Sequence, residues 1–177
     1  MPAETFNTFS AIGALLIGIF GLMTFFLAFF TPNHKITLFI KEKALLLIGF
    51  IVSGACLGSL VYSMGYNYSP CTLCWWQRIA LFPMIPLAFI GFWKKESIVS
   101  VWTISILAIF GTITSLYHNS LNFGLSPLIP CSANGSCTQN FVNEFGFVTI
   151  PLMSLCVFIA IIGILVCKKV NSPKIPQ

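Results

Sequence analysis

Two closely spaced cysteine pairs are the residues of this sequence most suited to chemistry. Cys71 and Cys74 lie in SPCTLCWWQR (residues 69–78), and Cys131 and Cys137 lie in PCSANGSC (residues 130–137). A C-x-x-C pair closes a small disulfide ring, and strained or exposed disulfides are the ones that exchange readily with thiols. The spacing therefore predicts thiol–disulfide exchange at the first pair, with the second pair as its candidate exchange partner.

The residues around the first pair favour a reactive thiolate. Pro70 precedes Cys71 and an apolar run begins at Cys74, which predicts a helix N-terminus whose free N–H groups lower thiol pKa values. Arg78 lies one helical turn beyond Cys74 and would favour an anion there. His118, in SLYH, is suited to proton transfer near neutral pH. Interfacial anchoring is the alternative role for both Arg78 and His118.

Other interpretations of the four cysteines stay open at this point. They could form two permanent disulfides that staple loops, or a four-thiolate zinc site, although the C-x5-C spacing of the second pair departs from the usual zinc pattern. The remaining cysteines fall within apolar runs and are interpreted as small buried hydrophobes: Cys56, Cys156 and Cys167.

The composition predicts an all-α integral membrane protein. Hydrophobic residues make up 57% of the chain and charged residues only 7%, against about 25% charged in soluble domains. A membrane-spanning helix needs about 20 apolar residues. Five runs qualify: Phe9–Phe30, Ala44–Tyr66, Trp75–Trp93, Ile98–Tyr117 and Val148–Cys167.

The lysines predict how these helices are threaded. If the five spans alternate in direction, the eight lysines that flank them all fall on one side, which is then the cytoplasmic side: Lys35, Lys41, Lys43, Lys94, Lys95, Lys168, Lys169 and Lys174. The N-terminus and both cysteine pairs are then extracytoplasmic, where disulfides persist. The net charge of +5 is explained by this topology and by anionic lipid, and no nucleic-acid motif is present.

A thiol relay needs a final electron acceptor. The chain has no glycine-rich dinucleotide fingerprint, no haem-attachment motif and no iron–sulfur spacing. A membrane-dissolved quinone requires none of these motifs, so a quinone beside Cys74, Arg78 and His118 is the hypothesis.

The motifs resemble one protein family. CTLCWWQRIALFP is similar to the first-loop signature of the DsbB-type disulfide bond formation proteins, especially their short-looped BdbC-like branch. SLYH, PCSANGSC and FVTIPLMSL resemble that family in the same order, and the match covers about residues 44–168. The resemblance implies a four-helix bundle of the bacterial inner membrane. It also implies a DsbA-like thioredoxin-fold partner that is reoxidised, and ubiquinone or menaquinone as electron acceptor.

The resemblance also implies roles for individual residues. Cys131 and Cys137 would be the loop pair that meets the partner, with Cys131 forming the mixed disulfide. Cys71 would exchange with the loop pair, and Cys74 would face the quinone and form a thiolate–quinone charge-transfer adduct. Arg78 would tune that adduct, and His118 matches a histidine near the quinone. Vitamin K epoxide reductases, the alternative enzyme class, carry the two motifs in the opposite order.

The first apolar run departs from the family pattern. Residues 1–43 are expected to form an additional helix and a cytoplasmic loop, residues 44–168 the DsbB-like domain, and residues 169–177 a cytoplasmic tail. The pair Phe141 and Phe145 favours either a short surface helix or a loop packed on the bundle. A non-enzymatic scaffold stapled by disulfides remains the alternative function.

Overall fold

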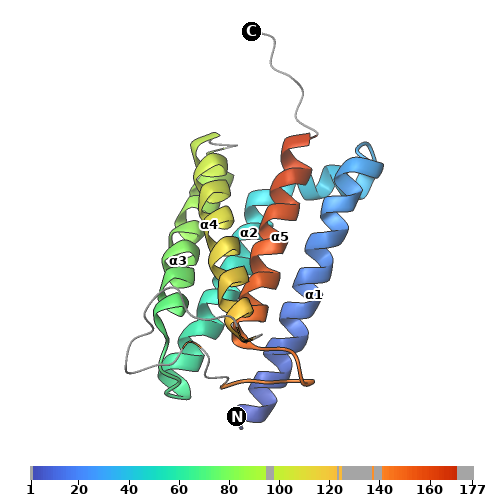
Figure 1. The fold of residues 1–177 in the computed structure, drawn as a ribbon. Helices are drawn as coiled ribbons and strands as arrows, with labels where there is room; N and C mark the ends of the chain where they lie inside the picture. Colours follow the sequence, from blue (N-terminus) through green and yellow to red (C-terminus); the bar gives the residue numbers. More distant parts are fainter. Residues whose placement is uncertain (1, 95–97, 123, 125–136, 138–140, 171–177) are drawn as a thin grey trace.

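The computed structural model describes residues 2–94, 98–122, 124, 137 and 141–170, and within them the fold is built from five long helices (Figure 1). Their bounds are α1 (Ala3–Phe30), α2 (Lys35–Leu60), α3 (Thr72–Trp93), α4 (Ile98–Asn122) and α5 (Ile150–Val170), and a π-helical turn, η1 (Val61–Gly65), extends α2. All five helices are long and apolar enough to cross a membrane, which confirms the predicted fold class.

Helix α5 occupies the middle of the bundle. It packs against α1 on one side and against α2 and α4 on the other, while α3 packs against α2 and α4. Phe158, Ile161 and Ile164 of α5 are completely buried in the main core. Many large side chains on the outer faces of the other helices are exposed, as expected where lipid replaces water.

The helices alternate in direction, so the chemistry-bearing segments gather at one end. The N-terminus, the start of α3, the end of α4 and the start of α5 lie together at the lower end in Figure 1. The described lysines lie at or near the opposite end, which is the segregation that the sequence predicts.

Several helix limits differ from the predicted apolar runs. α2 begins at Lys35, because the His34 side chain accepts a hydrogen bond from the N–H of Ile36 and caps a helix that continues through the lysine-bearing segment. α4 continues to Asn122, which places His118 inside the helix rather than at its end. α3 begins at Thr72, so Cys74 lies in its first turn.

Residues 141–149 form a turn, not the surface helix that was one of two expectations. Glu144 and Val148 form an isolated antiparallel bridge, and Phe145 has a positive φ of 55°. Phe141 stacks on Tyr68 with ring centroids 4.9 Å apart. The expectation of a loop packed on the bundle is the one confirmed.

Glycines allow α1 to approach α5 closely. A Cβ atom at Gly21 would collide with the backbone of Ala160, and one at Gly163 would collide with the carbonyl oxygen of Gly21. Close backbone approach through small residues is a common way to pack helices in lipid. The sequence of α1 therefore specifies attachment to α5.

The Gly21→Ala variant is expected to lose about 1–3 kcal/mol of stability, the usual cost of overpacking. The added methyl must push α1 away from Ala160. Gly13→Ala on the same helix is the matched control, because a Cβ there meets nothing within 4 Å. Thermal unfolding of both variants in detergent measures the difference, and equal melting temperatures would contradict the tight α1–α5 contact.

Candidate functional site

The first cysteine pair forms the N-terminal cap of α3. Cys71 is the capping residue, and its sulfur accepts a hydrogen bond from the backbone N–H of Cys74 at 3.4 Å. The two sulfur atoms are 3.1 Å apart, and both cysteines are free thiols. This confirms the predicted position of the pair at a helix N-terminus.

Hydrogen bonding makes Cys71 the more acidic thiol of the pair. The thiol of Cys74 hydrogen-bonds to its sulfur and lowers the pKa of Cys71 to about 4, against the opposing effect of burial. His118, with Nε2 at 3.8 Å from the Cys71 sulfur, and the N–H of Cys74 both contribute to this low pKa. Cys71 is therefore a thiolate at neutral pH, the form that attacks disulfides.

His118 connects the two cysteine motifs. Its Nε2 lies 3.2 Å from the carbonyl oxygen of Cys137, and its Nδ1 lies 3.4 Å from Nε2 of Gln77. When the Gln77 amide donates to Nδ1, the imidazole proton is on Nε2, where it can be donated to the Cys137 carbonyl or the Cys71 sulfur. His118 is only 3% exposed, so these contacts replace its hydration.

Cys137 packs directly into the same cluster. Cys71, Leu73, Leu121 and Cys137 are all buried together, with Cys74 against them. Cys137 is itself disulfide-bonded. Cys131, its predicted partner, lies outside the described residues. The structure thus brings one member of the loop pair to the C-x-x-C pair.

Arg78 is a buried cation held by a neighbouring helix. Its Nε donates to Oγ of Ser59 at 2.8 Å and its Nη2 donates to the carbonyl oxygen of Ser59 at 2.7 Å. Its guanidinium lies 5.3 Å from the centroid of the Trp75 ring. These contacts fix the plane of the guanidinium and explain how the side chain is tolerated at 8% exposure.

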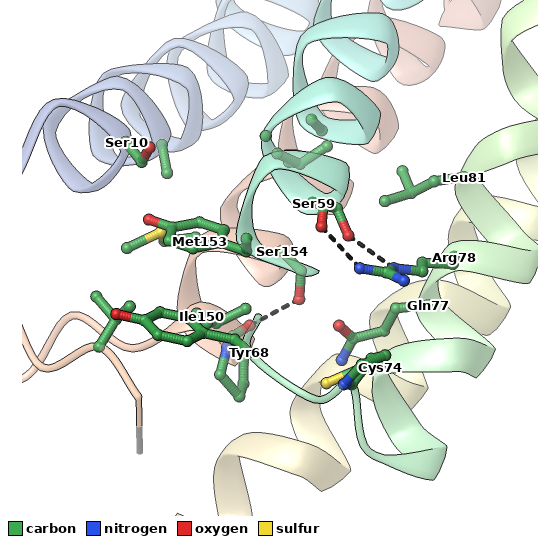
Figure 2. Close-up of a pocket in the computed structure, with 18 of the residues that line it drawn as sticks. Ser10, Ser59, Tyr68, Cys74, Gln77, Arg78, Leu81, Ile150, Met153 and Ser154 are labelled. Atoms are coloured by element: carbon green, nitrogen blue, oxygen red, sulfur yellow. Dashed lines mark hydrogen bonds between the residues drawn. The ribbon is translucent and has the colours of Figure 1, made fainter. Parts of the chain in front are cut away.

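Among the described residues, no carboxylate pairs with the guanidinium of Arg78. The ion pair found there joins Lys43 and Glu42. A buried unpaired charge is costly unless another anion compensates it. The side chain lies one turn further along α3 than Cys74 and lines the same cavity (Figure 2). The site is therefore suited to stabilise negative charge on a thiolate or on a bound ligand.

A cavity of about 320 Å³ extends from the cysteines into the bundle. Figure 2 shows Cys74, Gln77 and Arg78 on one side of it and Ser10 of α1 on the other. Its walls are mostly apolar, with a few polar groups, and its volume falls within the usual range for small-molecule sites, about 300–1,000 Å³. These features fit a flat, apolar ring that carries polar oxygens, as a quinone does.

The sequence identified most residues of this site but not the residues that hold Arg78 and His118 in place. Cys71, Cys74, Cys137, Arg78 and His118 all line the cavity. Gln77 and Ser59 had no predicted role of their own. Gln77 lies three residues after Cys74, a helical spacing that could have indicated it, whereas Ser59 belongs to another helix and gave no signal.

The same side chains offer a set of metal donors. One ligand atom from each of Cys71, Cys74 and His118 lies within 4.8 Å of the others. Two sulfurs and an imidazole suit a soft ion such as zinc. An ion held there would occupy the thiols that disulfide exchange requires.

The acidity of Cys71 predicts an unusual pH profile for its alkylation. In reduced protein, the rate of iodoacetamide modification at Cys71 should change little between pH 5 and pH 8, because the thiolate already dominates above a pKa of about 4. An ordinary thiol, with a pKa of about 8.5, gains roughly tenfold per pH unit over most of that range. The His118→Phe variant should move the inflection of the profile upward.

Mass spectrometry of the peptide that carries Cys71 measures this profile. Cys156, a half-buried free cysteine in α5, provides the comparison within the same sample. A tenfold rise per pH unit at Cys71 would contradict the thiolate assignment.

Comparison with known proteins identifies relatives of this chain. The family model described as "Disulfide bond formation protein DsbB" matches residues 41–167. "Probable disulfide formation protein C 2" of Bacillus anthracis is 38% identical over 125 residues, covering 70% of this chain and 89% of the relative. "SPbeta prophage-derived disulfide bond formation protein B" of Bacillus subtilis is 34% identical over 142 residues, covering 80% and 95%.

A further relative is "Disulfide bond formation protein C" of Bacillus subtilis, 36% identical over 110 residues, with 61% of this chain and 79% of the relative covered. No solved structure matches significantly. The family match begins at residue 41, within α2, so all of α1 precedes the matched region.

Proposed function

Since this chain belongs to the DsbB family of disulfide bond formation proteins, we propose that it is a quinone-dependent thiol oxidase. It reoxidises a DsbA-like thioredoxin-fold protein outside the cytoplasm and passes the electrons to a membrane quinone. The observation that carries this proposal is the free Cys71–Cys74 dithiol, packed against Cys137 on one side and opening onto the cavity beside Arg78 on the other.

The proposed path moves two electrons through two disulfides. A thiolate of the reduced partner attacks the Cys131–Cys137 disulfide, and the second partner thiol resolves the mixed disulfide, which leaves the partner oxidised and the loop pair reduced. The loop pair then reduces the Cys71–Cys74 disulfide in the same way. Oxidation of the Cys71–Cys74 dithiol back to the disulfide releases two electrons and two protons. A membrane quinone would accept them and leave as a quinol.

The two cysteines of the first pair have different duties in this path. Cys71 is buried at 4% exposure in the cluster with Cys137, so it is the member placed to exchange with the loop pair. Cys74 is the third residue of α3 and faces the cavity with Arg78 (Figure 2). We assign Cys74 to the quinone and Cys71 to the loop.

The polar groups on the α3 side of the cavity serve the acceptor. The guanidinium of Arg78, fixed by Ser59, stabilises negative charge at the cavity wall. It therefore lowers the free energy of the negatively charged state that forms as electrons reach the quinone. His118, oriented by Gln77, holds a proton on Nε2 close to the sulfur of Cys71. These residues bind and orient the ring and keep water out of the site.

This function places the protein in the bacterial inner membrane with the cysteine-bearing end outside the cytoplasm. Lysines at the opposite end support that orientation. In this arrangement residues 44–168 form the redox domain, residues 1–43 add a helix and its cytoplasmic connection, and residues 169–177 form a cytoplasmic tail. Membrane lipid surrounds the five helices.

The test combines purified protein, a reduced thioredoxin-fold oxidase and either ubiquinone or menaquinone. Quinone absorbance should fall as the partner is oxidised, in equal molar amounts. Thiol trapping should show that both cysteine pairs cycle between thiol and disulfide. Permanent disulfides that resist mild reductant, with no loss of quinone absorbance, would indicate a disulfide-stapled scaffold and overturn the proposal.

A further inference from the structure

Helix α1, which precedes the family match, supplies one wall of the cavity. Ser10, Gly13, Ala14 and Ile17 line it from α1, opposite the α3 residues of the site (Figure 2). The helix is held by α5 and touches α2 only slightly. The cavity is therefore bounded on this side by two helices that are not closely packed together.

The facing surface of α2 contains several small residues. Gly54 and Gly58 line the cavity, as does Gly13 across from them on α1, and a Cβ atom at any of the three would meet nothing within 4 Å. Gly54 is exposed, as is the neighbouring lining residue Phe50 at 63% exposure. The cavity thus reaches the lipid-facing surface along this stretch of α2.

A buried hydroxyl at the same wall lacks a hydrogen-bond partner. Tyr62, one turn beyond Gly58, is 7% exposed and lines the cavity, but its oxygen makes no hydrogen bond among the described residues. Ser10 of α1 lies close to it without reaching hydrogen-bond geometry. An orphaned buried hydroxyl costs about 1–3 kcal/mol, so a polar ligand atom at this position would relieve it.

We propose that α1 and α2 together form the chain-binding half of the quinone site. The Tyr62 hydroxyl donates a hydrogen bond to a ring oxygen, and the isoprenoid chain leaves between α1 and α2 over Gly58 and Gly54, against Gly13. This inference rests on the proposed function, and it assigns a substrate-binding role to the helix that the family match does not include.

The direction of the groove agrees with the chemistry of such a ligand. α2 runs toward the end of the bundle that carries the cysteines, so Gly54 lies deeper in the membrane than Gly58 and Tyr62 (Figure 1). A chain that follows these glycines leads from the polar ring site into the hydrocarbon interior. Glycines allow it to lie close to the helix backbone.

The test compares two quinones with the same ring, a ubiquinone with two isoprene units and the ring without a chain. Dissociation constants are measured by quenching of tryptophan fluorescence without partner protein, and KM is measured by turnover. Gly54→Leu and Gly13→Leu should each raise the dissociation constant of the chain-bearing quinone about tenfold, which corresponds to about 1.4 kcal/mol. The chain-free ring should change by less than about twofold.

Matched controls place similar bulk on the outer faces of the same helices. Leu57→Phe on α2 and Leu16→Phe on α1 alter residues that are 64% and 62% exposed and do not line the cavity, so both quinones should bind normally. Gly54→Ala should give an intermediate effect and guards against misfolding of the leucine variant. Tyr62→Phe, which keeps the ring, should weaken both quinones about fivefold, consistent with one lost hydrogen bond.

The outcomes separate this inference from the proposed function. Equal weakening of both quinones by the glycine variants, or no weakening of either, would overturn the chain-binding role of α1 and α2. Normal binding of both quinones to Tyr62→Phe would overturn the role of the hydroxyl. A native protein that neither binds nor reduces these ubiquinones or menaquinone would instead refute the proposed function itself.

Discussion

Cys74→Ser protein is expected to reduce quinone at least about 1,000-fold more slowly than the native protein, a loss of about 4 kcal/mol of transition-state stabilisation. Serine keeps the size of the side chain but cannot form the disulfide that must be restored at each turnover. A serine hydroxyl also takes no part in thiol–disulfide exchange. The measurement is quinone absorbance under steady-state turnover with reduced partner.

Cys156→Ser is the control for this result. Cys156 is a free cysteine of α5 that does not line the cavity, so its loss should leave quinone reduction within about twofold of native. Normal reduction by the Cys74→Ser variant would show that the quinone-facing thiol has been assigned wrongly, and Cys71 would then be the residue to test.

Cys131→Ser and Cys137→Ser proteins are expected to lose partner-driven quinone reduction by at least about 100-fold while keeping reduction driven by dithiothreitol. The loop pair carries electrons only from the partner, and a small dithiol can reach the first pair without it. Cys137 is packed against Cys71, which is why it is positioned for this transfer. Parallel assays with the two reductants measure the separation.

The two reductants also give this prediction its internal control. Equal losses with partner and with dithiothreitol would mean that the loop pair is needed for the structure of the quinone site rather than for transfer. Unchanged partner-driven reduction would remove the loop pair from the path. Thermal unfolding of each variant shows whether the disulfide itself contributes to stability, as disulfides commonly do by about 2–4 kcal/mol.

α1 links the loop to the bundle as well as lining the cavity. Thr8 donates a hydrogen bond to the carboxylate of Glu144 at 3.2 Å, and Ala11 and Ala14 pack with Val142 and Val148. Residues 142–148 thus pack on the first helix. A helix that is absent from the matched family region therefore contacts residues 142–148 and also lines the cavity.

The sequence by itself determined the membrane class, the five spans, the shared end of the cysteine motifs and the position of the first cysteine pair at a helix N-terminus. These features depend on contiguous stretches of chain: an apolar run must satisfy its own backbone in lipid, and a helix start is fixed by a few adjacent residues. The spacing of Cys74 and Arg78 likewise follows from one helical turn.

Only the tertiary structure decided how the site is supported. Ser59 holds Arg78 from 19 residues away, Gln77 orients His118 from 41 residues away, and His118 approaches Cys71 from 47 residues away. Contacts of this kind depend on which helices become neighbours. Apolar helix faces are equally stable against lipid and against another helix, so hydrophobicity alone does not decide which helices pack together. The choice is made by close steric fits such as Gly21 against Ala160, because small residues admit only the partner whose backbone can approach.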